Sequence, residues 1–101
     1  MLNQTVIVGR LVNNPEKIEE EERKVAKITL AVPRSFKNAD GEYETDYIPV
    51  RLFGGVAENT TEWCNKGDLV GIKGRLQSND GIIELIAEKV TFLSQAKKDE
   101  E

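Results

Sequence analysis

The stretch YIPVRLFGGVAENTTEWCNKGDLVGIKGRL, residues 47–76, carries the pattern that decides the fold. In its first part the aliphatic residues Ile48, Val50 and Leu52 occupy every second position, and the positions between and around them are Tyr47, Pro49, Arg51 and Phe53. This period of two is that of a β-strand with one buried face. Two adjacent glycines end that strand. A short helix is expected over residues 56–65 and a second strand over residues 69–76. The stretch therefore predicts a strand, a short helix and a strand.

The helix is predicted from four residues that fall near one face and from a stop signal. Val56, Thr60, Trp63 and Cys64 share that face, and Lys66-Gly67 supplies a C-terminal stop. We expect Trp63, the single tryptophan of the chain, to cap the end of a barrel. Cys64 is expected to be a small buried apolar residue.

Working outward from this stretch, three further strands are predicted. Residues 5–11 form a β-branched run that ends at the turn Asn13-Asn14-Pro15. Residues 25–32 alternate clearly, and the strand that contains Ile48 begins at about residue 43. The last strand is expected over residues 82–93.

Two turns and one acidic segment connect these strands. Asp40-Gly41 and Asn79-Asp80-Gly81 are hairpin signals. Residues 16–23 contain almost no apolar side chain besides Ile18, so we expect either a solvated loop or the frayed end of a strand.

The order of the elements defines the fold class. Three strands, one short helix and two strands are the layout of the all-β OB-fold, a five-stranded Greek-key barrel with its helix between the third and fourth strands. An SH3-like barrel and a small sandwich are the alternatives, and the position of the helix favours the first. At 101 residues the chain has material for one core, so we expect one domain over residues 1–94 and a short polar tail over residues 95–101.

Composition narrows the class of protein. The chain lacks a long apolar segment and the layout of a signal peptide, so we expect a cytoplasmic protein with no membrane partner. The net charge is −4, but the run Glu19–Glu22 carries four negative charges and residues 97–101 one more, which leaves the remaining body at +1. A body of that charge can still present a basic groove, because the local field steers a ligand.

No enzyme signature is found. The chain has no histidine and one cysteine, which excludes histidine-based catalysis and an intrachain disulfide, and makes a zinc site improbable. The glycines match neither a phosphate-binding loop nor a dinucleotide fingerprint. Glu58 and Glu62 are four residues apart, but a solvated helix face explains them. We therefore expect no catalytic residue, no metal ligand and no cofactor.

The outward side of residues 43–53 is the best candidate for a binding face. Tyr47, Arg51 and Phe53 recur there at a period of two, so two aromatic rings flank a guanidinium. Unpaired bases stack on aromatic rings while cations contact the phosphates, so such a face suits single-stranded nucleic acid. The other interpretation is that this side packs in a second layer of core or in a subunit interface.

Further candidates lie on either side of this strand. Phe36, between Arg34 and Lys37, is either a third stacking residue on a mobile arm or a loop aromatic that tucks onto the barrel. The other basic candidates are expected to point outward from their strands, and each alone is compatible with an ordinary solvated charge. They are Arg10, Lys27, Lys73 and Arg75.

Five segments together resemble the bacterial single-stranded DNA-binding protein family over about residues 1–93. They are VIVGRL with the following NPE (6–11 and 14–16), VAKITLAV (25–32), TDYIPVRLFG (45–54), EWCNKG at the end of the helix (62–67) and VGIKGRL in the fourth strand (70–76). The segments match in order and with few gaps.

The resemblance implies an OB-fold whose stacking residues are Phe36, Tyr47 and Phe53, two of them where the best-known members carry tryptophan. It implies a homotetramer paired through the first strand, with a dimer as the alternative. The family places a further aromatic in a long hairpin that is cut here to residues 77–81, which implies a smaller footprint. Recruitment of replication enzymes through an acidic tip is doubtful, because residues 97–101 do not resemble that tip.

Two functions follow as hypotheses. The first is binding and protection of single-stranded DNA without sequence preference in replication, recombination or repair, through the aromatic residues and the cations Arg10, Arg34, Lys37, Arg51, Lys73 and Arg75. The second is an assembly module of the replication machinery that keeps the barrel and binds DNA weakly or not at all.

Overall fold

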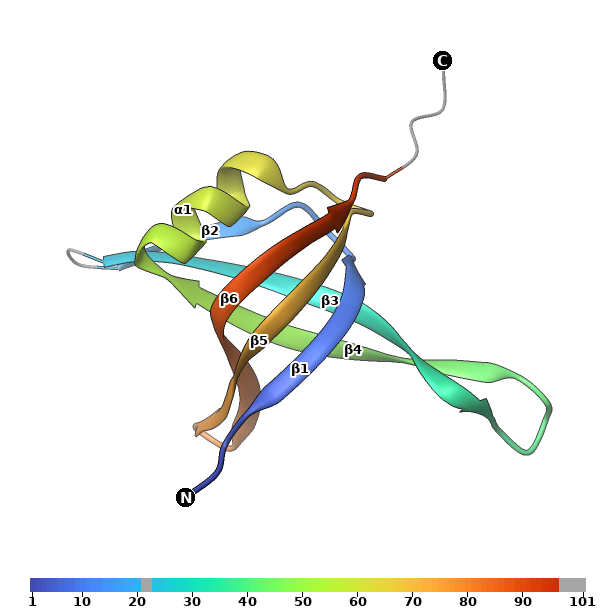
Figure 1. Cartoon of the computed structure of the whole chain (residues 1–101). Coiled ribbons are helices and arrows are strands. Elements are labelled where there is room, and N and C mark those ends of the chain that lie inside the picture. Colours follow the sequence, from blue (N-terminus) through green and yellow to red (C-terminus); the bar gives the residue numbers. More distant parts are fainter. Residues whose placement is uncertain (21–22, 97–101) are drawn as a thin grey trace, which may run out of the picture.

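The computed structural model describes residues 1–20 and 23–96. Its elements are β1 (Thr5–Leu11), β2 (Glu16–Glu20), β3 (Arg23–Lys37), β4 (Tyr43–Phe53), α1 (Gly54–Trp63), β5 (Leu69–Asn79) and β6 (Ile82–Ser94). Figure 1 shows the helix over one end of the strands and a long ribbon of β3 and β4 that projects on the other side. Each predicted strand is found, and the helix begins two residues earlier than expected.

The strands close into a barrel. They form one sheet in the order β1-β5-β6-β4-β3-β2, and β1 also pairs with β3. That last pairing, with Arg10 opposite Ala31 and Leu11 opposite Leu30, joins β1, β3, β4, β6 and β5 into a closed ring of five strands. β4 and β6 are parallel. With α1 after the third strand of the barrel, this architecture confirms the predicted OB-fold.

β2 lies outside the ring as an edge strand on β3. Of the two expectations for this segment the strand is found, because residues 16–20 pair antiparallel with β3 from Glu16 opposite Lys27 to Glu20 opposite Arg23. Ile18 lies opposite the buried Val25 and is itself partly buried, so this cross-strand apolar pair supports the pairing of the edge strand. Residues 21 and 22 of the acidic run lie outside the described residues.

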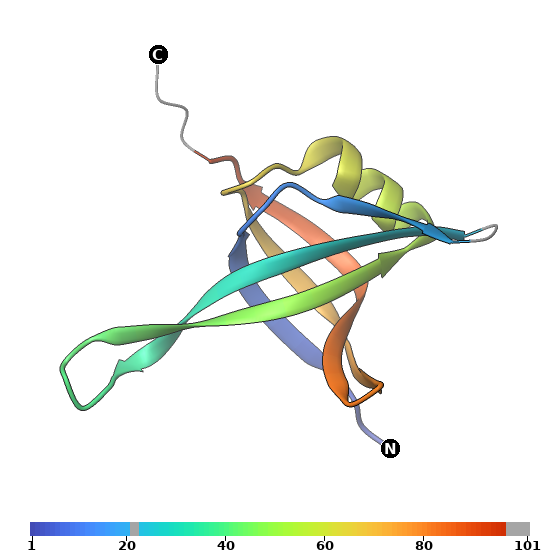
Figure 2. The same ribbon diagram turned by 180° about the vertical axis from the view of Figure 1, so that it is seen from behind.

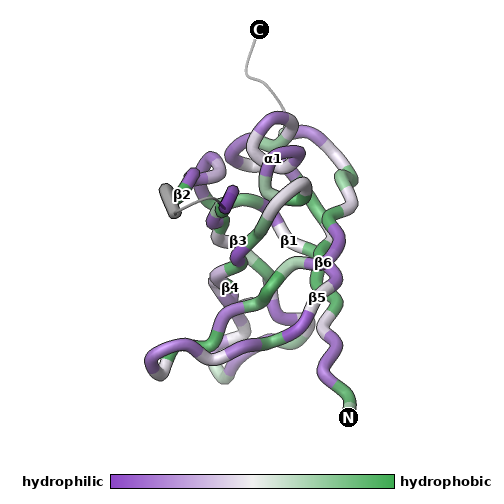
Figure 3. The backbone as a smooth tube through the Cα atoms, turned by 90° about the vertical axis from the view of Figure 1, so that its left-hand side faces the viewer, coloured by the Kyte–Doolittle hydropathy of each residue, from purple (hydrophilic) through white to green (hydrophobic). Residues whose placement is uncertain are grey.

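The core fills the inside of the ring. The inward positions predicted for β4 are correct, because Val50 and Leu52 are completely buried. They pack with other apolar residues of β1, β3, β5, β6 and α1, namely Leu11, Ala26, Ile28, Leu30, Ala57, Cys64, Val70, Ile72, Leu85 and Ala87. Figure 3 shows hydrophobic colours in the barrel strands and mainly hydrophilic colours along the projecting ribbon.

β3 runs five residues past its predicted end and, with β4, forms a projecting arm (residues 33–45). Pro33 was expected to close the strand, but it lies beyond the pairing with β1, where the ribbon has an open edge that tolerates a proline. The register shifts between Pro33 and Lys37. The predicted turn at Asp40-Gly41 is confirmed, since Gly41 has a φ of +79°. Figure 2 shows the arm from the other side.

Trp63 does not cap the barrel. Its side chain is 66% exposed, and the residues of α1 and its C-cap that close the barrel end are Ala57, Thr60 and Cys64. These three follow the i, i+3, i+7 spacing of one helix face, which leaves Trp63 at the edge of that face. Cys64 is buried as predicted, and burial, with a smaller effect from Asp68, raises the pKa of its thiol.

Candidate nucleic-acid interface

The outer side of β4 presents the predicted aromatic and basic residues in one row. Tyr47, Arg51 and Phe53 alternate with inward-facing Ile48, Val50 and Leu52, because side chains on a strand point to opposite sides in turn. The Tyr47 ring is 64% exposed. Phe53, at the helix end of β4, is partly buried. The two rings thus present unequal areas to a ligand.

Arg51 lies between the two rings and is held by an acid. Its Nε and Nη2 donate to the two carboxylate oxygens of Glu84 on β6, each at 3.2 Å. The side chains of Arg51 and Glu84 are 22% and 8% exposed. A buried carboxylate needs a partner, so this ion pair stabilises the sheet surface between the two rings. The positive charge of Arg51 is therefore already balanced by Glu84.

A cation that sequence reasoning missed covers Phe53. The guanidinium of Arg23, at the start of β3, lies 4.9 Å from the centre of the ring, within the range of a cation–π contact. Val25, two residues further on, lies directly opposite Phe53 in the register. The signal for Arg23 is this cross-strand pairing, which a single sequence does not specify.

Three of the basic candidates share the outer side with the β4 row. Arg10 lies opposite Ala31, which lies opposite Tyr47. Arg75 lies opposite Ile86, which lies opposite Arg51, and Lys27 is directly opposite Arg51. Two of these guanidinium groups make local hydrogen bonds, Arg10 to the carbonyl of Gly67 and Arg75 to the side chain of Gln77.

Lys73 shares the outer side of β5 with Arg75, two residues further on, but its register row includes no residue of β4. It is exposed on β5, opposite Val6 of β1 and Lys89 of β6. Its row therefore lies on the part of the barrel made by β1, β5 and β6, and Lys89 adds a second exposed cation there.

The arm carries Phe36 and Lys37 away from the barrel body. Phe36 is 64% exposed, so it does not tuck onto the barrel. The ammonium of Lys37 lies 5.8 Å from the centre of the Tyr43 ring. Tyr43 is also more than half exposed, and the sequence analysis did not single it out. The signal was present, because Tyr43 shares the period of two with Tyr47.

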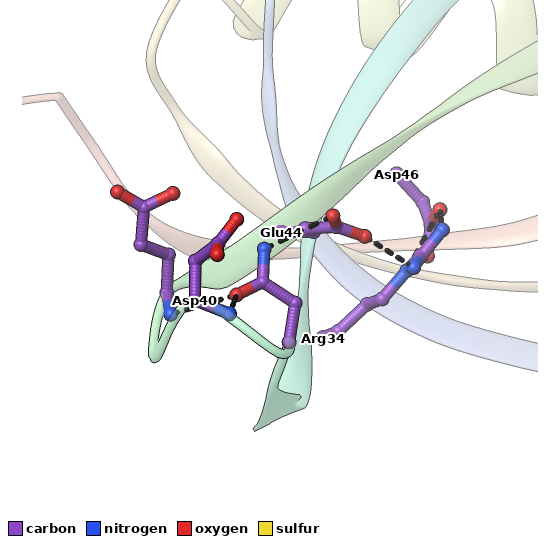
Figure 4. Close-up of polar contacts among 6 residues, drawn as sticks. Arg34, Asp40, Glu44 and Asp46 are labelled. Atoms are coloured by element: carbon purple, nitrogen blue, oxygen red, sulfur yellow. Dashed lines mark hydrogen bonds and ion pairs between the residues drawn. The ribbon is translucent and has the colours of Figure 1, made fainter.

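Arg34 lies on the other side of the arm, in an ion-pair cluster (Arg34, Glu44 and Asp46). Its Nη2 and Nε donate to Asp46 Oδ1 and Oδ2 at 2.8 and 3.1 Å, and its Nη1 donates to Glu44 Oε1 at 2.6 Å (Figure 4). The hydrogen bonds between Arg34 and Asp46 lower the pKa of Asp46 and raise the pKa of Arg34. The phosphate contact expected of Arg34 would have to displace these carboxylates.

Residues 1–20 and 23–96 contain no group of three His, Cys, Asp or Glu side chains that could hold a metal. Glu58 and Glu62 are exposed on α1, and Glu58 pairs with Lys24. Among the same residues no helix has the length and apolar character needed to cross a membrane.

A five-stranded OB barrel with exposed aromatic rings and cations on its outer sheet belongs to a class of small barrels that bind oligonucleotides. The profile of the single-strand binding protein family matches residues 2–93. The chain is therefore a member of the single-strand binding protein family.

Individual relatives agree with this membership. Single-stranded DNA-binding protein B of Bacillus subtilis (strain 168) is 43% identical over 92% of this chain and 91% of its own length. Single-stranded DNA-binding protein 1 of Staphylococcus aureus (strain MSSA476) is 38% identical over 99% of this chain and 70% of its own length. Single-stranded DNA-binding protein 1 of Clostridium acetobutylicum is 38% identical over 96% of this chain and 98% of its own length.

Proposed function

We propose that this protein binds single-stranded DNA without sequence preference and thereby protects it during replication, recombination or repair. The observation that carries the proposal is the exposed ring of Tyr47 on a sheet surface with cations on neighbouring strands, in a chain of the single-strand binding protein family. Bases stack on rings irrespective of their identity, which accounts for the absence of sequence preference.

The binding face selects single strands because its aromatic rings can stack only with bases that are not already stacked in a duplex. Tyr47, Phe53 and Phe36 serve as stacking residues, and Arg10, Lys37, Lys73 and Arg75 neutralise phosphates together with Lys27. Arg51 and Arg34 remain candidates, but each is held by carboxylates, so the geometry favours structural roles for both. No reaction is part of this function, and it needs no metal or cofactor.

The proposal includes an oligomer in the cytoplasm, a tetramer with a dimer as the alternative. What supports it is the outer side of β1, where Val6 and Val8 are 67% and 48% exposed. Apolar residues that recur on one exposed side of a strand suit a contact with a second copy of the chain. Residues 1–94 would form the DNA-binding domain and residues 95–101 a short polar tail, of which residues 97–101 lie outside the described residues.

The test is a titration of a labelled dT oligonucleotide followed by fluorescence anisotropy. We expect Tyr47→Ala with Phe53→Ala to weaken binding by roughly 2 to 6 kcal/mol, since each stacked base contributes about 1 to 3 kcal/mol. Thr29→Ala, a substitution without a ring on the same outer side, is the control.

The outcomes separate the alternatives. A folded double variant that binds as tightly as the unchanged protein contradicts stacking at these rings. If the unchanged protein gives no anisotropy change at micromolar concentration but retains a replication protein from solution, the assembly-module function replaces DNA binding.

A further inference from the structure

Tyr43 lies on the same side of β4 as Tyr47. Side chains alternate along a strand, so Tyr43, Thr45 and Tyr47 share one side, and four residues separate the two rings by about 13 Å. The Tyr43 ring is 60% exposed, close to the 64% of Tyr47. An aromatic side chain this exposed on a projecting ribbon contributes little to the core, so its position calls for another explanation.

A cation accompanies this ring. Lys37 is the register partner of Tyr43, and its Nζ lies 5.8 Å from the centre of the ring. A ring for a base and an ammonium for the neighbouring phosphate are the two parts of a step in a single-strand binding groove. The pair therefore repeats, on the arm, the combination found around Tyr47.

The carboxylates of Glu44 and Asp46 are turned away from this side of the arm. Glu44 and Asp46 alternate with Tyr43, Thr45 and Tyr47 and so lie on the reverse side. There Glu44 accepts hydrogen bonds from Arg34 and from Asn38, and Asp46 is held by Arg34 (Figure 4). The ion-pair cluster thus lies on one side of the arm, and Lys37 lies beside an exposed ring on the other.

The arm is also held in shape before any ligand binds. The side-chain oxygen of Asn38 accepts hydrogen bonds from the backbone of Asp40 and Glu42, at 2.9 and 3.0 Å. The backbone of Asn38 donates to the carbonyl of Glu42 and accepts from Gly41. A ring placed by such a turn loses less conformational entropy on binding than one on an unstructured loop.

From these four observations we propose that Tyr43 is a further base-stacking residue, with Lys37 on the adjoining phosphate. The DNA strand continues from Tyr47 along the arm, and Tyr43 supplies an aromatic contact that the short β5–β6 hairpin lacks. This inference rests on the proposed function, since it extends the same binding face.

The experiment compares Tyr43→Ala, Tyr43→Leu and Tyr43→Phe in the full chain, with a labelled dT oligonucleotide of about 16 nucleotides, the upper end of OB-fold site sizes. Removal of the ring should weaken binding roughly 5- to 150-fold, which is the stacking contribution of one base expressed as an affinity ratio. Tyr43→Phe keeps the ring and should bind within about twofold. Thr45→Ala, on the same side between the two tyrosines, is the matched control and should also leave binding unchanged.

The leucine variant protects the test against local unfolding, because it keeps an apolar side chain on the strand. If Tyr43→Leu binds like the unchanged protein while Tyr47→Ala is weakened, stacking at Tyr43 is wrong and the proposed function stands. If the unchanged protein itself does not bind the oligonucleotide, both the function and this extension fail. A loss in Tyr43→Phe equal to that in Tyr43→Ala would also overturn the assignment to the ring.

Discussion

At the scale of single residues, Gly74 shows how closely the strands approach each other in a small barrel. A Cβ at this position of β5 would collide with the backbone carbonyl of Ile86 on β6. Backbone atoms cannot turn aside as a flexible side chain can. The absence of a side chain at residue 74 is therefore a requirement of the closed sheet.

We expect Gly74→Ala to lower the free energy of unfolding by about 1 to 3 kcal/mol, the usual cost of overpacking. Urea denaturation measures it. Gly71→Ala on the same strand is the control, because its added Cβ would meet only ordinary contacts at 3.8 Å or more. Equal stability of the two variants would show that β5 and β6 can separate at residue 74 without cost.

At the scale of elements, the arm depends on the ion-pair cluster of Arg34, Glu44 and Asp46, which acts as a clamp between its two strands. Arg34 of β3 holds Glu44 and Asp46 of β4, next to the register shift where regular pairing is interrupted. Because the pKa of Asp46 is lowered in the folded protein, the clamp contributes fully above the pKa of an unfolded aspartate, about 3.9. Its contribution is lost as the pH falls through the lowered pKa.

Because Arg34 is held in the clamp and Lys37 is not, we expect the two residues to differ in their effect on the salt dependence of DNA affinity. Arg34→Gln should leave the slope of log affinity against log salt concentration unchanged, since the Arg34 charge is neutralised by carboxylates. Lys37→Gln should reduce the slope by roughly 0.7, the amount for one phosphate contact on a single strand. Anisotropy titrations at several salt concentrations measure both.

An independent readout follows the clamp itself. In Arg34→Gln the pKa of Asp46, followed by NMR, should return to the ordinary range of aspartate, because its hydrogen-bond donor is gone. A decrease in the salt slope for Arg34→Gln as large as that for Lys37→Gln would mean that Arg34 leaves its carboxylates and binds phosphate.

At the scale of the whole molecule, the barrel presents different surfaces on different strands. The β3 and β4 strands extend into the arm (Figure 1). These two strands carry the exposed aromatic rings of the binding face, whereas β1 exposes Val6 and Val8. The net charge of −4 does not describe either surface, since the cations lie on outward strand positions and the excess acid is concentrated in the run at residues 19–22. The exposed aromatic rings of the binding face and the exposed valines of β1 therefore lie on separate strands.

If β1 mediates assembly, Val6→Glu with Val8→Glu should convert the oligomer to a smaller species, measured by sedimentation equilibrium. In a two-fold contact the new carboxylates would meet their own copies, and like charges repel in such an interface. Asn13→Glu, in the exposed turn after β1, adds a charge outside the strand and should leave the mass unchanged. An unchanged mass for the β1 variant would place the contact elsewhere.

Much of the barrel could be predicted because its signals are local. Alternation placed Val50 and Leu52 inward, and the hairpin signal at Asn79-Asp80-Gly81 is realised with positive φ at both Asp80 and Gly81. Prediction from the sequence was wrong, or left alternatives open, where a neighbouring element decides the outcome. Trp63 lies at the edge of its helix face and does not cap the barrel. Residues 16–20, for which the sequence allowed a loop or a strand, form the edge strand β2 because β3 is beside them.

The sequence by itself determined the order of the elements, the inward side of each strand and the aromatic and basic character of β4, because periodicity and turn chemistry act between near neighbours. Only the tertiary structure decided which charges are balanced. Glu84 lies 33 residues from Arg51 in the sequence, and Arg23 of β3 lies over the Phe53 ring of the neighbouring β4. Such partners meet only when the sheet closes. The register of the strands therefore decides which cations can bind phosphate and which hold the fold together.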